Sequence, residues 1–181
     1  GKSIFSKDES VIYMKDTKFN NCKKGAATIA EKSKIIIDGG VEIINSSNTA
    51  LRSIMNSQIK AHDLKIKNTD GNCINMEDSK GYFVNCEFDN TEHPTIAVIG
   101  HKSNPIFNNC KLYNNKSTFC VVCKNGCRPL FDDCQFYDCE TNCFSISDFS
   151  QPHIQNCYFE NIDKYFFNLF GCSHLTFDNI K

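Results

Sequence analysis

Residues 105–115 read PIFNNCKLYNN, and residues 129–139 read PLFDDCQFYDC, a near copy that keeps the apolar, small polar and cysteine positions in place. A looser copy, PHIQNCYFENI, occupies residues 152–162. Similar sequence at a fixed spacing indicates a solenoid in which each repeat forms one coil. We therefore expect a stack of similar coils rather than one irregular globular core.

The position of Cys110 recurs along the whole chain about every 23 residues, with a shorter last interval. Another apolar residue follows two positions later, and an outward position lies between them, as in a strand whose side chains alternate. The expected equivalents of Cys110 are Thr17, Val41, Leu64, Cys86, Cys134, Cys157 and Leu175. The outward column is expected to be Lys18, Glu42, Lys65, Glu87, Lys111, Gln135 and Tyr158. The first five members alternate in charge, which favours stacking in this register.

The residue before each of these positions, apart from the last, is glycine, asparagine or aspartate, the types that tolerate a left-handed backbone. A corner is therefore predicted once per repeat at Asp16, Gly40, Asp63, Asn85, Asn109, Asp133 and Asn156. An apolar strand precedes each corner and ends at Met14, Phe83, Phe107, Phe131 and Ile154. A third apolar segment follows a polar loop at residues 26–30, 72–76, 95–99, 119–123, 143–147 and 166–170.

Three short strands per repeat predict an all-β fold, a parallel β-helix of about eight coils that forms a single domain over residues 1–181. A leucine-rich repeat is the alternative at this period, since FNNCKLYNN imitates part of its pattern. The rest of each repeat is β-branched and aromatic rather than helical in pattern, which favours the β-helix.

The repeats SNPIFNNCKLYNN, followed by FCVV, and SQPHIQNCYFEN, followed by FFNLF, resemble those of right-handed parallel β-helices in the pectate-lyase-like superfamily. They are most similar to the non-catalytic β-helix repeats of F-box-only proteins. The resemblance covers residues 10–180 as a pattern, and it implies a right-handed solenoid that recognises a substrate or partner within a larger intracellular protein. Cysteine stands where many such coils have Ile, Leu or Asn.

The composition excludes several classes of partner. Lys and Arg number 20 against 21 Asp and Glu, so no overall positive field is available to attract nucleic acid. We find no apolar run of the ~20 residues that a membrane helix requires, and the first residues lack the apolar core of a signal peptide. Neither nucleic acid nor membrane is therefore expected, and the charge itself does not name a partner. The rigid faces of stacked coils lead us to expect a protein or peptide partner, with glycans as the alternative.

The 12 cysteines are predicted to be buried side chains rather than a metal centre. Four occupy the Cys110 column, and Cys120 is expected on an inward face beside Ile96 and Phe144. The spacing CVVCKNGC resembles a zinc cluster, so Cys123, Cys127 and Cys139, at strand ends or turns, are the residues to test for metal. We predict no metal and no cofactor. Thiols without evident pairing suggest a reducing compartment, and we expect a cytoplasmic protein.

The repeat gives no positive evidence for catalysis, and we expect the domain to be non-catalytic. Fragments of the polygalacturonase signature occur as NTDG (68–71), GH (100–101), and Asp132 with Asp133. Hydrolysis of a glycosidic bond requires carboxylates gathered on one surface. The repeat frame instead puts Asp70 and His101 in different turns and Asp133 in a corner.

The binding surface is predicted on the third strand of each coil, whose outward column contains no expected charge. Its members are Thr28, Asn75, Ala97, Val121, Ser145 and Asn168. Rigid, flat columns suit an extended protein partner. The alternatives are that neighbouring loops cover this column, or that Tyr113, Tyr137 and Tyr158 stack on sugars; only Tyr113 and Tyr137 are expected to share a column.

Both ends of the sequence look open, because the first and last residues fall within expected coils. End coils of solenoids normally carry polar caps. We therefore expect either that the chain is part of a longer protein or that copies associate end to end.

Overall fold

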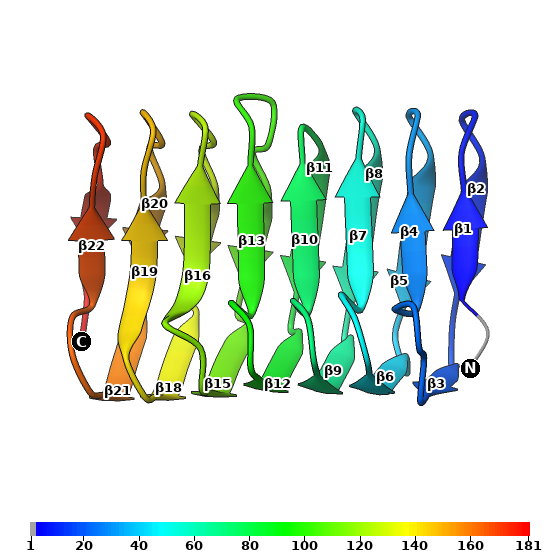
Figure 1. Cartoon of the computed structure of the whole chain (residues 1–181), viewed down its shortest axis with the longest axis horizontal. Helices are drawn as coiled ribbons and strands as arrows, with labels where there is room; N and C mark the ends of the chain where they lie inside the picture. The colour runs from blue at the N-terminus through cyan, green and yellow to red at the C-terminus, as the bar shows by residue number, and fades with distance from the viewer. Residues whose placement is uncertain (1–2) are drawn as a thin grey trace.

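The computed structural model describes residues 3–181, apart from the side chain of Asn90. These residues form three parallel β-sheets that run along the length of a solenoid, and they contain no helix (Figure 1). Each strand pairs with the equivalent strands of the preceding and following coils. The predicted all-β solenoid of about eight turns of ~23 residues, with three strands in each, is confirmed.

Sheet A contains the strands that were predicted as the third apolar segment. It consists of β1 (Ile4–Ser6), β4 (Ala27–Ile29), β7 (Leu51–Ile54), β10 (Ile74–Glu77), β13 (Ile96–Ile99), β16 (Phe119–Lys124), β19 (Asn142–Ile146) and β22 (Phe167–Leu169).

Sheet B contains the strands that precede the predicted corners. It consists of β2 (Val11–Met14), β5 (Lys34–Asp38), β8 (Gln58–His62), β11 (Lys80–Val84), β14 (Ile106–Asn108), β17 (Leu130–Asp132), β20 (His153–Gln155) and β23 (Thr176–Asp178).

Sheet C follows those corners and contains one strand fewer among the described residues. It consists of β3 (Lys18–Asn20), β6 (Glu42–Ser46), β9 (Lys65–Thr69), β12 (Glu87–Thr91), β15 (Lys111–Asn115), β18 (Gln135–Cys139) and β21 (Tyr158–Ile162).

The corner between sheets B and C has a left-handed backbone in every coil, as predicted. Asn85, Asn109 and Asn156 have φ angles of 54°, 49° and 55°. Their side chains also link successive coils, since the Asn109 Nδ2 donates to Asn85 Oδ1 at 2.8 Å. Asparagine therefore supplies both the backbone conformation and an amide that bonds to the next coil.

A second left-handed corner, which the repeat pattern did not predict, lies at the end of the sheet C strand in six coils. Its residues share positive φ angles near 50° with the first corner, and they are again asparagine or aspartate. They are Asn21, Asn45, Asn68, Asn114, Asp138 and Asn161. This corner turns the chain back toward sheet A, and a further left-handed turn, at Asn56 and Asp148 for example, connects sheet A to sheet B.

One predicted register is wrong at the C-terminal end. Leu175 was expected to be the equivalent of Cys110, but Phe177 pairs with Ile154 in sheet B. The corner residue is Asn179, with φ of 48°, so Ile180 occupies the inward position of the Cys110 column. The spacing of Leu175 and Phe177 resembles the apolar pair of a sheet C strand. Pairing with the preceding coil, however, requires the repeat length of about 23 residues, which Ile180 satisfies and Leu175 does not.

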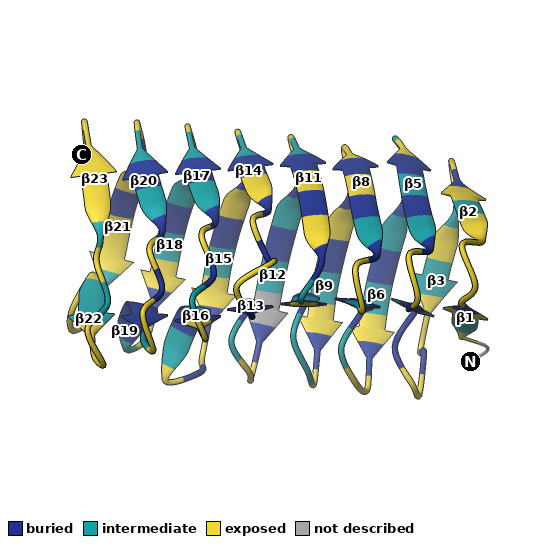
Figure 2. Ribbon diagram, turned by 90° about the horizontal axis from the view of Figure 1, so that it is seen from above, coloured by how far each residue is buried: buried dark blue, intermediate teal, exposed yellow. Residues whose placement is uncertain are grey.

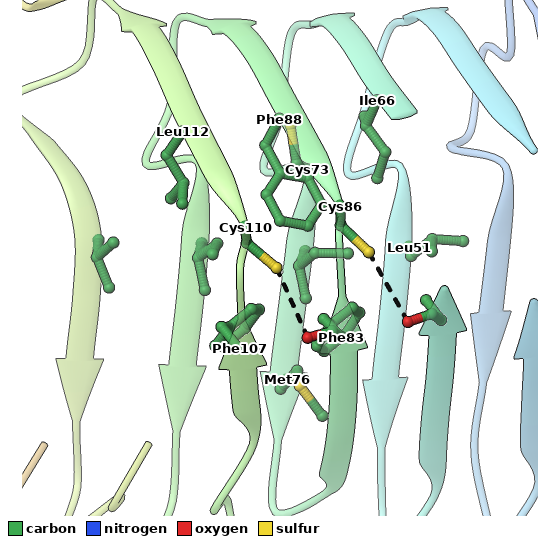
Figure 3. Packing of buried hydrophobic residues seen from close by; sticks show 14 of the residues in the cluster. Leu51, Ile66, Cys73, Met76, Phe83, Cys86, Phe88, Phe107, Cys110 and Leu112 are labelled. Carbon is green, nitrogen blue, oxygen red and sulfur yellow. Dashed lines mark hydrogen bonds between the residues drawn. The ribbon is translucent and has the colours of Figure 1, made fainter. Parts of the chain in front are cut away.

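The core is a set of inward columns in which like side chains stack (Figures 2 and 3). The rings of Phe83, Phe107 and Phe131 lie parallel, with centroids 4.7 and 4.8 Å apart. This separation equals the spacing between neighbouring strands, so identical rings in register make offset-stacked contacts automatically.

The cysteines of the Cys110 column are buried, and their thiols have a specific role (Figure 3). The Cys110 Sγ donates to the carbonyl oxygen of Phe83 at 3.6 Å, and the Cys86 Sγ donates to that of Ala61 at 3.8 Å. Cys134 and Cys157 repeat the contact with Phe107 and Phe131. The thiol is thus a small apolar group that also satisfies a buried carbonyl at the corner.

The outward charges of sheet C pair between coils, as their alternation predicted. Lys18 Nζ lies 3.1 Å from Glu42, and Lys65 Nζ lies 3.5 Å from Glu87. These side chains are exposed, so each pair contributes at most about 1 kcal/mol. Their main effect is to favour the correct register over one that opposes like charges.

Within the part of the chain described, no helix could cross a membrane.

We expect Asn109→Ala to lower the free energy of unfolding by about 1–3 kcal/mol, because alanine tolerates the left-handed corner poorly and cannot bond to Asn85. Asn109→Gly restores the backbone freedom, as Gly40 does in an earlier coil, and should cost less. Urea unfolding measures both values, with Asn104→Ala in an exposed turn as the control. Equal losses for alanine and glycine would refute the backbone explanation.

Candidate functional site

Most residues of the predicted outward column on sheet A do face outward, but the prediction assigned one residue wrongly and left one residue out. Val121 is fully buried and pairs with Ile96, so it does not face outward. Val122 takes that place, because it pairs with Ala97 on one side and Ser145 on the other. The loop before it is one residue longer: seven residues separate Asn114 from Val122, whereas six separate Asn68 from Asn75.

The column also includes a charge that was not expected. Arg52 pairs in register with Thr28 and Asn75, and its guanidinium lies 3.3 Å from the Glu77 carboxylate. Ala97 and Ser145 are only 6% exposed. These two residues are therefore nearly closed to a partner, whereas Asn75, Val122 and Asn168 are partly exposed. The burial of Ala97 and Ser145 favours the alternative that neighbouring groups cover the column at those positions.

The fragments of the polygalacturonase signature lie at three different edges of the solenoid. Asp70 follows a sheet C strand, His101 lies in the turn from sheet A to sheet B, and Asp133 forms a corner between sheets B and C. The His101 Nδ1 lies 4.0 Å from Asp78 rather than near either of the other residues. The predicted separation of Asp70 and His101 in different turns is confirmed.

A long polar groove runs along the second corner, where sheet C turns toward sheet A. We call it the corner groove; it has two adjoining hollows, which share Asn68 and Lys116. The first hollow is lined by Asn21, Lys23, Asn45, Ser47, Asn68, Thr69, Asp70, Glu92 and Lys116. The second is lined by Asn68, Asp89, Asn114, Lys116, Asp138, Cys139, Glu140, Asn161 and Asp163.

One wall of the corner groove is a ladder of amides and carboxylates from the left-handed corners. The Asn68 Nδ2 donates to Asn45 Oδ1 at 3.2 Å, and the Asn161 Nδ2 donates to Asp138 Oδ1 at 2.8 Å. Asn114 likewise donates to Asp89 at 2.7 Å. Because these side chains bond across coils, they are held in place before any partner arrives.

The second hollow is acidic. Four carboxylates and one lysine line it, and the carboxylates belong to Asp89, Asp138, Glu140 and Asp163. Among the described residues, none of these carboxylates lies within 4.0 Å of a Lys, Arg or His nitrogen, unlike the paired charges on sheet C. The first hollow balances two lysines against two carboxylates. Negative charge therefore accumulates toward the C-terminal half.

A cluster of tyrosines lies on the face of sheet C beside the acidic hollow. Tyr113 pairs in register with Tyr137, as predicted, but Tyr158 is not isolated from them. The rings of Tyr137 and Tyr158 lie 5.9 Å apart although they belong to neighbouring columns. Burial, aided by the nearby Asp89, raises the pKa of Tyr113 to about 12.

Eleven cysteines are buried, and Cys172 is exposed. Cys120 is buried as predicted, but its neighbours differ from those expected. Ile96 and Phe144 pair with Val121, so Cys120 stacks between Thr95 and Cys143 instead. This shift by one residue brings Cys120 toward Cys139, a contact that the repeat analysis missed. The signal that could have found it is the longer loop after Asn114.

Cys73 illustrates the usual state of a buried thiol in this core. Burial raises its pKa to about 12, although its thiol lies 3.7 Å from the Thr69 hydroxyl. It stays protonated wherever the chain is folded at ordinary pH. Such a thiol is a packing group with no nucleophilic role.

Comparison with known proteins supports the fold. A family model described as "Right handed beta helix region" matches residues 50–181. No curated protein matches the sequence significantly.

Two solved structures resemble the chain weakly. One, from Parabacteroides merdae, is provisionally described as a glycosyl hydrolase; it has 10% identity and a TM-score of 0.31, with 95% of this chain and 80% of that chain covered. The other, QnrB1, a plasmid-mediated fluoroquinolone resistance protein, has 12% identity and a TM-score of 0.21, with coverage of 94% and 91%.

The buried thiols predict a loss of stability at alkaline pH. Above pH ~9 the Cys73 thiol ionises in the unfolded chain and not in the folded one, so the unfolded state binds fewer protons. The free energy of unfolding should fall by about 1.4 kcal/mol per pH unit from this residue alone, up to its folded pKa of about 12.

Cys73→Ala tests this, because Ala50 already occupies the same column. We expect its urea-unfolding free energy to decline less steeply between pH 9 and 10.5 than that of the parent, in reducing buffer. Cys172→Ala is the control for removal of an exposed thiol. Identical slopes for Cys73→Ala and the parent would exclude the effect.

Proposed function

Because the chain belongs to the family of right-handed β-helix regions, we propose that it is a non-catalytic recognition module that binds an extended, basic segment of a partner protein along the corner groove. The observation that carries the proposal is the set of unpaired carboxylates in the second hollow. A binding role for this groove differs from the face on sheet A that the repeat pattern favoured.

The charge of the hollow favours a cationic partner. On sheet C, Lys18 faces Glu42 in register and Lys65 faces Glu87, so that these opposite charges neutralise one another. Asp138, Glu140 and Asp163 are exposed and have no such cation within 4.0 Å among the described residues. A lysine- or arginine-rich segment would gain charge-assisted hydrogen bonds with them at little desolvation cost.

The dimensions of the hollow favour an extended chain. Its lining residues come from five successive coils, from Asn68 to Asn161. With coils spaced by ~4.8 Å, the hollow is roughly 19 Å long, which accommodates about six residues of extended peptide. The amide ladder offers donors and acceptors along this length that can bond to a peptide backbone.

The resemblance to F-box-only repeats is consistent with this role, because it implies recognition of a partner by stacked coils. It rests on the repeat pattern alone, and the matched family is broader. A β-helix fold by itself supports many functions, so the proposal depends on the groove and not on the fold.

A second candidate function is glycan binding, which the tyrosine cluster favours. Tyr137 and Tyr158 are in ring contact, and Tyr113 pairs in register with Tyr137 on the neighbouring strand. Aromatic faces next to carboxylates and amides are suited to the apolar face and the hydroxyls of a sugar. The hydroxyl of Tyr137 already donates to Gln135 Oε1 at 2.7 Å, so Tyr137 would bind a sugar mainly by stacking of its ring and not through its hydroxyl.

Peptide binding is tested with the combined substitutions Asp138→Asn, Glu140→Gln and Asp163→Asn. We expect a fluorescently labelled eight-residue Lys/Arg peptide to bind the parent, and to bind the variant at least tenfold more weakly, because three charges are removed without changing side-chain size. Fluorescence anisotropy measures the Kd, and binding to the parent should weaken as salt is raised.

The matched control is the pair Glu42→Gln and Glu87→Gln, which removes acidic charge from sheet C. These carboxylates are already paired with lysines, so the peptide should bind as tightly as to the parent. Equal weakening by both sets of substitutions would show nonspecific attraction. Equal binding by the groove variant and the parent would reject the groove.

Glycan binding is tested on a glycan array followed by calorimetry on any bound sugar. We expect Tyr137→Ala to weaken such binding by about 1–2 kcal/mol, since one stacking ring is lost. Tyr13→Ala is the control, because Tyr13 is exposed on sheet B away from the cluster. A sugar that binds both variants equally would exclude the tyrosine cluster.

A further inference from the structure

We propose that Cys120, Cys139 and Cys143 form a three-thiolate site for a soft monovalent metal ion, Cu(I). The site is separate from the proposed peptide groove in function, although it lies beneath it. From the repeat pattern, no metal site was expected.

The three sulfurs converge from two sheets. Their Sγ atoms all lie within 4.8 Å of one another, and the side chains are at most 1% exposed. Cys120 and Cys143 come from neighbouring strands of sheet A, whereas Cys139 ends a strand of sheet C. In a trigonal site with metal–sulfur bonds near ~2.3 Å, the sulfurs would be ~4 Å apart, so small side-chain movements would suffice.

The site lies directly beneath the corner groove. Cys139 is 1% exposed and lines the acidic hollow, and it is the cysteine of the cluster that does so. A small movement of the side chains over Cys139 would let an ion meet this thiol first and then the two deeper ones. The carboxylates of Asp138 and Glu140 at the entrance would attract a cation.

The surrounding core is polar on one side. The Cys120 thiol contacts the Thr95 hydroxyl at 3.7 Å, and Thr95 accepts a hydrogen bond from Asn115 Nδ2 at 3.0 Å. Asn115 also donates to Thr91 Oγ1 and precedes Cys139 in its inward column. A hydroxyl held in this way can reorient to donate to a thiolate, so it orients the ligand.

Packing alone does not require thiols at these positions. The inward column of Cys120 and Cys143 contains alanines at Ala26 and Ala50, and that of Cys139 contains Ser46. Some coils thus fill the same places without sulfur, although Cys73 belongs to the same column as Cys120 and Cys143.

The ligand set selects the metal. Soft thiolates favour Cu(I), which accepts three ligands, whereas structural Zn²⁺ takes four. Within the described part of the chain, no fourth His, Cys, Asp or Glu joins the group. Binding of Cu(I) to three thiols forms three Cu–S bonds and releases up to three protons to solvent. The oxidation state of the copper does not change.

The experiment uses the reduced full chain under anaerobic conditions, with Cu(I) supplied as its acetonitrile complex in competition with bicinchoninate. We expect one Cu(I) per chain to resist the competitor, and X-ray absorption to give three sulfur neighbours at ~2.3 Å. Cys139→Ser and Cys143→Ala should each weaken binding at least tenfold. Both introduce residues that other coils carry in the same columns, so the fold should tolerate them.

The matched control is Cys86→Val, which alters a buried cysteine of the Cys110 column; Val41 occupies the same column. It should retain the copper. The proposal is overturned if the competitor removes all Cu(I) from the parent, or if the cluster variants retain the Cu(I). It is also overturned if X-ray absorption shows only two sulfur neighbours, which is the number that binding to Cys123 and Cys127 would give. Four-coordinate Zn²⁺ bound more tightly than Cu(I) would overturn the choice of metal. The absorption result on the parent decides the question even if a variant fails to fold.

Discussion

The parallel backbone hydrogen bonds between successive coils are the constraint on which the rest of this structure depends. They hold equivalent residues directly over one another in all three sheets. Each side chain therefore meets its own equivalent at the strand spacing of ~4.8 Å. Rings stack on rings, thiols on thiols and asparagines on asparagines, and any residue that cannot tolerate this arrangement destabilises two interfaces at once.

This constraint explains why the cysteine columns need no disulfides or metal to be stable. A corner exposes a backbone carbonyl to the interior, where water is excluded, and the thiol of the next coil donates to it, as Cys110 does to Phe83. Leucine or valine fills the same column in earlier coils and offers no donor. The thiol gains a weak hydrogen bond that an aliphatic side chain cannot supply.

The fold could be predicted from the sequence because similar residue types recur at the same period in every column. The corners before Cys110 and Cys134 were recognisable from Asn109 and Asp133 alone, since few residue types tolerate their backbone. The candidate site could not be predicted in the same way. The corner groove arises where side chains of several coils meet across a turn, and one extra residue after Asn114 moved Val121 and Cys120 away from their expected neighbours. A register predicted from the repeat is therefore correct within a strand and becomes wrong after a loop whose length differs from that in the other coils.

The failure of the predicted register at this loop has a physical reason. Strict stacking neutralises charges on the sheet faces, since Lys65 meets Glu87 in the next coil. The carboxylates without a nearby cation, the longer loop and the convergence of Cys120 with Cys139 all occur at the edge where sheet C turns toward sheet A. Side chains at this edge still bond to the neighbouring coil, as Asn161 does to Asp138. The length of the loop, however, can change without altering the pairing of the strands, so this edge can acquire a binding function without loss of the stack.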